Sequence, residues 1–147
     1  MSIWVWVLFI HILGAALWVG GQLALSLIVL PTARRLLTEE DRLRVLTPVG
    51  KRFGILTLAA MLPVQVATGV ALAVHNGVTW RSLVEPGYGL TLTVKLALVV
   101  VVMAAAGVHG LLSVRQHPVA ARVVAMFGLV CSVAILLFAA ALGTGWS

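Results

Sequence analysis

Charged residues are scarce in this chain. They make up 10% of its 147 residues, against about a quarter in soluble globular proteins, and only four of them are acidic. A soluble domain needs many more charged side chains to cover its surface with hydrated groups. With 62% of the residues hydrophobic, the composition excludes a soluble domain and predicts an integral membrane protein.

Cysteine is scarcer still, since Cys131 is the only one. A single cysteine excludes an internal disulfide and a Cys-x-x-Cys metal motif. Cys131 lies in an apolar stretch, where a cysteine usually packs as a small hydrophobic residue. The internal methionines are dispersed along the chain, so no methionine-rich motif for Cu(I) is present either.

Long apolar runs are abundant instead. Four segments reach the ~20 residues that a membrane-spanning helix needs, at about 3–30, 53–76, 89–114 and 119–146. No stretch remains for a separate soluble domain, and the connections are short. The prediction is therefore an all-α fold, an up-down antiparallel four-helix membrane bundle that forms a single domain over residues 1–147.

Proline and glycine mark where these helices are expected to break. Pro31 is predicted to end the first helix because it cannot continue the hydrogen-bond ladder. Residues 38–46 carry a helix-start signature and a narrow apolar stripe, which predict a short interfacial helix on the cytoplasmic surface. Pro48 and Gly50 are expected to break that helix, and Pro63 is expected to kink the second span.

The net charge of +6 reflects topology. Eight of the ten basic residues lie in two of the three connections, which the positive-inside rule places in the cytoplasm. Both termini then face outward from a bacterial cytoplasmic membrane. Anionic lipid is the predicted partner at the cytoplasmic face, and nucleic acid is not. The six basic residues of the first connection are Arg34, Arg35, Arg42, Arg44, Lys51 and Arg52.

Two ionisable residues, His11 and Lys95, lie well inside apolar segments. Such residues cost several kcal/mol in the bilayer core and are usually functional, so they point to a metal, a cofactor or protons. His11 shares one helix face with Gly14 and Trp18, by their three- and four-residue spacing. The small residues on this face allow close approach of either a neighbouring helix or a flat cofactor.

Helix rise separates the candidates by depth. His11 lies ~12 Å and Lys95 ~9 Å below the outer ends of their helices, so the two are level. His75 lies closer to the outer surface, within reach of a broad cofactor. His109 is ~18 Å deeper than His11, which excludes one ion bound by all the histidines. Gln65, near mid-membrane, is predicted to hydrogen-bond between helices.

Several motifs resemble the copper-resistance D (CopD) membrane domain family. They are His11 with Trp18-Val-Gly-Gly21, Lys51-Arg-Phe53, Thr68-Gly69, Tyr88-Gly89-Leu, and Lys95-Leu-Ala-Leu98. The chain also resembles the HemJ type of protoporphyrinogen oxidase, a small four-helix protein associated with b-type haem. His11, Trp18, Lys95 and His109 fit that second pattern.

Three functions follow. The first is b-type haem binding for electron transfer or oxidation, with His11 as axial ligand, His75 as the second ligand and Lys95 as the propionate partner. If the protein is an enzyme, it is then a membrane haem-dependent oxidoreductase. The CopD resemblance implies copper binding or transport instead, with His11 and His75 as ligands. The third is an accessory subunit of a larger membrane complex. The expected protein partner is either such a complex or a further copy of the chain.

Overall fold

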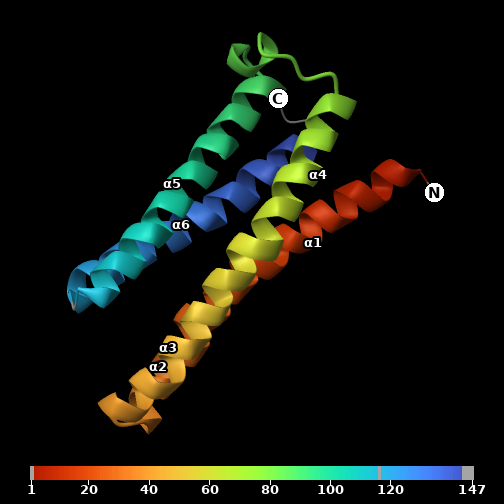
Figure 1. Ribbon diagram of the computed structural model, residues 1–147. Helices are drawn as coiled ribbons and strands as arrows, with labels where there is room; N and C mark the ends of the chain where they lie inside the picture. Colours follow the sequence, from red (N-terminus) through yellow and green to blue (C-terminus); the bar gives the residue numbers. More distant parts are fainter. Residues whose placement is uncertain (1, 116, 144–147) are drawn as a thin grey trace. The chain divides into compact units, whose positions relative to one another are not determined.

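The computed structural model describes residues 2–115 and 117–143, and this part of the chain is helical without a strand. Four helices in it are long and apolar enough to cross a membrane. The chain is therefore an all-α integral membrane protein with four long helices, as predicted. It divides into two compact units, residues 1–76 and 77–147, each a helical hairpin (Figure 1). The last predicted span, 119–146, ends outside the described residues.

The first arm of the first unit runs without a break from Ile3 to Leu36. It comprises α1 (Ile3–Ala24), the π-helical turn η1 (Leu25–Val29) and α2 (Leu30–Leu36). The prediction that this helix ends at Pro31 is wrong. In η1 the N–H of Leu30 bonds to the carbonyl of Leu25, so the ladder shifts register just before the proline. Pro31 then lies in the first turn of α2, where its missing N–H is tolerated.

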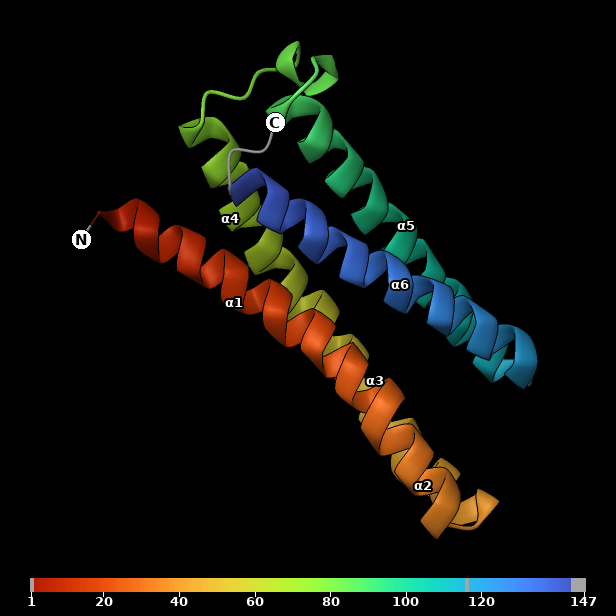
Figure 2. The same ribbon diagram turned by 180° about the vertical axis from the view of Figure 1, so that it is seen from behind.

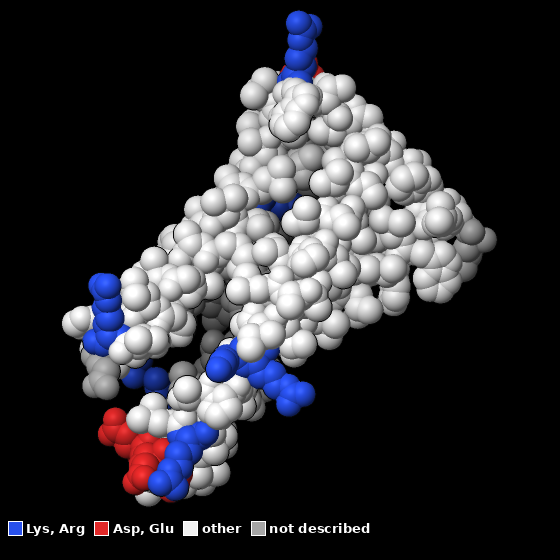
Figure 3. Space-filling view, in the orientation of Figure 1, with Lys and Arg blue, Asp and Glu red and all other residues white. Residues whose placement is uncertain are grey.

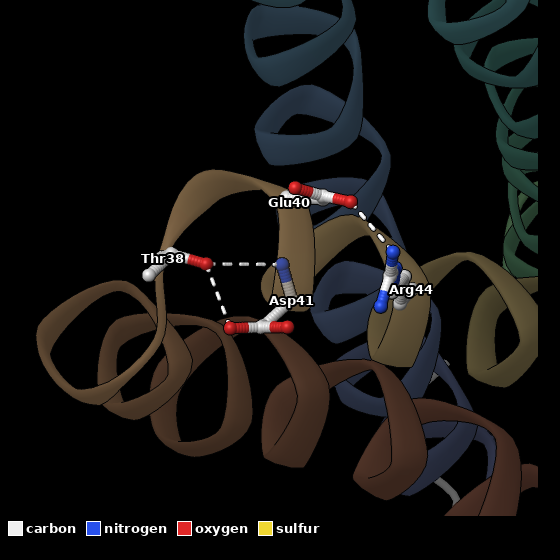
Figure 4. Close-up of polar contacts among 4 residues, drawn as sticks. All are labelled: Thr38, Glu40, Asp41 and Arg44. Atoms are coloured by element: carbon white, nitrogen blue, oxygen red, sulfur yellow. Dashed lines mark hydrogen bonds and ion pairs between the residues drawn. The ribbon is translucent and has the colours of Figure 1, made fainter.

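The second arm comprises α3 (Glu39–Leu56), the π-turn η2 (Thr57–Met61) and α4 (Leu62–His75). It begins where the sequence predicts, because the Thr38 hydroxyl caps α3 by accepting from the Asp41 N–H at 3.2 Å (Figure 4). The predicted short interfacial helix is wrong, however, because α3 continues through Pro48. Pro48 and the residue four positions before it, Arg44, are both exposed, so the proline lies on a part of the helix that other elements do not cover.

Both arms carry the same irregularity. Each π-turn is followed by Leu-Pro, at Leu30-Pro31 and at Leu62-Pro63. In η2 the Leu62 N–H donates to the Thr57 carbonyl, repeating the bond in η1. At Pro63, where a kink is expected, the structure has a π-turn just before the proline and the helix remains continuous.

The two arms of the first unit pack α1 against α4 (Figures 1 and 2). Val19 of α1 is fully buried. Gly21 lies so close to the Phe53 ring that an added Cβ would be 2.6 Å from Phe53 Cε2. Most other large apolar side chains of this hairpin are exposed, as expected for helices that face lipid.

The second unit pairs α5 (Tyr88–Val114) with α6 (Pro118–Gly143). Ahead of α5, a loop with the short helix η3 (Ser82–Val84) folds onto the helix start. Gly89 makes this possible, because a Cβ there would collide with the Ser82 carbonyl. Along the α5–α6 contact small residues meet, with Gly128 next to Ala105.

Candidate functional site

The predicted site residues fall into both units. His11, Gly14 and Trp18 lie on α1, while Gln65 and His75 lie on α4. Lys95 and His109 lie on α5 of the second unit. The first group therefore lies on the two helices that form the α1–α4 contact of the first unit, and this contact is the candidate site.

The His11 imidazole bonds across this contact to Thr68. The His11 Nδ1 lies 2.8 Å from Thr68 Oγ1, and Thr68 Oγ1 lies 2.6 Å from the Val64 carbonyl oxygen. A carbonyl can only accept, so the single hydroxyl proton of Thr68 is donated to Val64. The Thr68 oxygen must then accept from an N–H at His11 Nδ1. In the neutral ring, Nε2 is consequently the unprotonated nitrogen that carries the lone pair.

Gln65 ties α4 to the backbone beside this histidine. Its Nε2 donates to the His11 carbonyl oxygen at 2.7 Å. An added Cβ on Gly14 would collide with that same Nε2, so the glycine makes room for the amide. On the other side, an added Cβ on Gly69 would lie 3.3 Å from Cε1 of the His11 ring.

The small-residue face of α1 is thus a helix contact at the level of His11. The sequence left open whether a helix or a flat cofactor approaches Gly14, and at Gly14 the structure places the Gln65 amide. The prediction that Gln65 hydrogen-bonds between helices is confirmed. Thr68 holds the His11 imidazole at Nδ1, and Gln65 holds the His11 backbone at the carbonyl oxygen.

His75 lies at a different level of the hairpin. Its ring is exposed and stacks on the Trp4 indole, with centroids 3.8 Å apart and planes 9° from parallel. Seven residues separate Trp4 from His11 and Thr68 from His75, a rise of ~10 Å along either helix. Metal–nitrogen bonds are about 2.0–2.1 Å long, so one ion needs ligand nitrogens within about 4 Å of each other. The structure does not bring His11 and His75 together at one ion.

Trp18 continues the His11 side of α1 towards the other end of the hairpin. It is half-buried and lies seven residues after His11, again ~10 Å along the axis. It therefore shares a face with the histidine without sharing its level.

In the second unit, Lys95 and His109 lie on α5 and both are half-buried. The His109 Nδ1 is 2.8 Å from the Ala121 carbonyl oxygen of α6, so Nδ1 carries the proton there too. Fourteen residues separate Lys95 from His109, ~21 Å along the helix. The predicted level pairing of Lys95 with His11 joins residues of different units and stays a prediction.

Within residues 2–115 and 117–143, no three His, Cys, Asp or Glu side chains group as a metal site would require. The donor at the α1–α4 contact is a single imidazole with a defined tautomer. One imidazole is sufficient as an axial ligand of haem iron. The residues present at His11 therefore fit a haem ligand.

Sequence reasoning missed the contact that His75 makes with Trp4, because aromatic residues at helix ends are ordinary in membrane proteins. The sequence pointed to Gly69 only through the family resemblance.

No protein-family model matches the chain, and no curated protein or solved structure matches it either. The CopD and HemJ resemblances therefore remain predictions.

Proposed function

We propose that this protein binds b-type haem through His11 and takes part in electron transfer or oxidation in the membrane. The observation that carries the proposal is the hydrogen-bond chain from His11 Nδ1 through Thr68 Oγ1 to the Val64 carbonyl. These two hydrogen bonds hold the imidazole in the tautomer whose Nε2 can bind a metal. Metal-binding histidines are typically oriented by such a bond at the other ring nitrogen.

The surroundings of His11 support the same function. Neither α1 nor α4 contains Asp, Glu, Lys or Arg, so an apolar macrocycle beside His11 would meet none of these charged side chains from the two helices. His11 itself is half-buried. A bound haem would supply one-electron chemistry at its iron, while His11 would hold the iron and Thr68 would hold His11.

The decisive measurement is the visible spectrum of the full chain, purified in detergent from cells supplied with a haem precursor. Wild-type protein is expected to show a Soret band with about one b-type haem per chain, and His11→Ala is expected to lose it. His117→Ala, in the connection between α5 and α6, is the matched control and should keep the band.

The alternatives give different results in the same preparation. A colourless protein holding stoichiometric copper, lost in His11→Ala, would support copper handling. A folded protein that holds neither would support the accessory role in a complex. Lys95→Gln tests the predicted propionate partner, and it should weaken haem binding while leaving the band position unchanged, because it does not touch the iron.

We also infer that the protein resides in a bacterial cytoplasmic membrane with both termini outside. The support is the charge distribution, because the α2–α3 end of the first unit holds six basic residues. Single cysteines introduced near Ser2 and near Thr47, in a Cys131→Ser background, test this. The first should react with an impermeant thiol reagent in intact cells, and the second should react only after lysis.

A further inference from the structure

The α2–α3 end of the first unit extends well beyond the length needed to cross a bilayer. Its arms contain 34 and 37 residues, or about 51 and 55 Å of helix, against a hydrocarbon core of about 30 Å. Charged side chains gather at this end of the hairpin (Figure 3). In the second arm the uncharged stretch begins only at Phe53, so α3 up to Arg52 lies at or beyond the membrane surface.

Two of the three acidic residues of α3 form contacts within the helix or with its N-cap residue. Glu39, Glu40 and Asp41 lie in its first turn, where negative charge favours the helix dipole. Asp41 also accepts from the Thr38 hydroxyl at 2.8 Å. Glu40 pairs with Arg44 at 2.6 Å on the exposed surface (Figure 4).

Most basic residues of this end are not compensated in that way. Within the part of the chain that the structure describes, Arg35, Arg42, Lys51 and Arg52 form no ion pair. Arg35, Lys51 and Arg52 are exposed and Arg42 is partly exposed. These cations are therefore available to an anionic partner.

Two of these unpaired cations, Arg42 and Arg52, belong to a stripe of α3 that is otherwise apolar. At 100° per residue, five positions of α3 lie within about 80° of one another. These positions are Arg42, Val45, Val49, Arg52 and Leu56, and we call them the α3 stripe. Its three apolar members are exposed, by 51%, 39% and 49% in chain order. Arg44 and Lys51 lie about 120° and 140° away from its centre.

We propose that the α3 stripe binds anionic phospholipid at the membrane surface. Leu56 lies inside the uncharged span and would contact acyl chains, and Arg52 follows at the level of the phosphates. The uncharged run of the first arm ends at Ala33 and measures about 46 Å, so the hairpin must tilt strongly to fit a hydrocarbon core of about 30 Å. With that tilt Val45 and Val49 would rest on the headgroup region, and Arg42, ~15 Å further along the helix, would bind a second headgroup. A helix face that carries cations next to apolar side chains complements an anionic phospholipid at the point where α3 leaves the membrane as the continuation of α4.

The charge balance favours lipid over a second copy of the chain. The corresponding end of another copy carries the same excess of six basic over three acidic residues, so two such ends would repel each other. An anionic lipid complements the cations and the apolar positions at once. The proposal does not depend on haem binding, since the α3 stripe and His11 lie at opposite ends of the hairpin.

Native mass spectrometry of the full chain in detergent tests the site. The chain is titrated with dioleoylphosphatidylglycerol and, separately, with dioleoylphosphatidylcholine. Wild-type protein should bind the anionic lipid more tightly. Arg52→Gln and Arg42→Gln should each weaken that binding about fivefold, the contribution expected of one cation near an anionic surface, with no effect on phosphatidylcholine.

Lys51→Gln is the matched control, because it removes an exposed positive charge without an ion pair from another face of α3. It should change the affinity less than twofold, and Arg52→Lys should retain most of the wild-type affinity. Val49→Gln should weaken binding of both lipids and gives a second measure of the site if an arginine variant misfolds.

Three results would overturn the proposal. One is equal affinity for the two lipids in wild-type protein. Another is an equal loss in Lys51→Gln and Arg52→Gln, which would show diffuse attraction to the whole hairpin end. The third is a lipid-free dimer that Arg52→Gln dissociates, which would assign the stripe to a second copy of the chain.

Discussion

His11 of α1 and Thr68 of α4 are joined across the first hairpin by a hydrogen bond of 2.8 Å, in which the imidazole Nδ1–H donates to the hydroxyl. The hydroxyl proton is used at Val64, so Thr68 cannot act as the donor. One threonine thereby determines which nitrogen of a membrane-embedded histidine can bind a ligand.

Thr68→Val should weaken haem binding by about 10- to 100-fold without abolishing it, because it removes the group that orients the ligand and leaves the ligand in place. The measurement is a haem titration followed at the Soret band. Thr68→Ser keeps the hydroxyl and should bind almost as wild type. Thr93→Val, which loses a bond to the Leu83 carbonyl in the second unit, controls for the loss of a threonine hydroxyl. Unchanged haem affinity in Thr68→Val would contradict the orienting role.

Gly14→Ala should lower the stability of the first hairpin by about 1 kcal/mol, because the new Cβ displaces the Gln65 amide from the His11 carbonyl. The free energy of unfolding in mixed detergent micelles measures this. Gly20→Ala is the control, since a Cβ there meets nothing within 4 Å, and it should raise stability slightly through helix propensity. In the Gln65→Ala background the cost of Gly14→Ala should largely disappear, and an undiminished cost would rule out the amide as its cause.

Thr57→Val should raise the free energy of unfolding by about 1 kcal/mol, because the Thr57 hydroxyl is buried without a hydrogen-bond partner. Valine has nearly the same shape and no polar group to desolvate. The contrast is Thr91→Val, whose hydroxyl donates to the Gly87 carbonyl at 2.9 Å and which should lose stability. A destabilised Thr57→Val protein would show that the hydroxyl is satisfied in the membrane.

His75→Ala should cost about 0.5–1.5 kcal/mol of stability through loss of the stack on Trp4, and should leave the Soret band intact. His75→Phe removes the ring nitrogens but keeps an aromatic face for Trp4, so most of the stability should return. Thermal unfolding followed by circular dichroism, together with the visible spectrum, separates the two effects. A Soret shift in both variants would identify His75 as an iron ligand after all.

Charge and hydropathy alone were enough to predict the membrane class and the number of long helices. Both depend on the length of uncharged runs such as that between Phe53 and Asn76, and a run of that length must be helical in lipid whatever it packs against. The start of α3 was predictable for a similar reason, because Thr38 caps the helix through a contact three residues away. Gln65 was predicted as an interhelical group because an amide at mid-membrane requires a partner.

Helix continuity depended on more than local signals. Pro31 and Pro48 are ordinary helix breakers, yet both arms continue past them. A π-turn before Pro31 and the exposed position of Pro48 reduce the cost of the missing N–H groups. Packing along the whole hairpin then favours a continuous helix. That packing cannot be predicted from short sequence windows.

The sequence by itself determined that this is a helical membrane protein with ionisable residues inside its apolar runs, because transfer of such groups into lipid depends on residue type and position along the chain. Only the tertiary structure decided which nitrogen of His11 carries a proton, that Gln65 covers Gly14, and that His75 lies ~10 Å from His11 along the hairpin. Those relationships join residues more than fifty positions apart. They depend on the register of α1 against α4, which is set by side-chain contacts between helices.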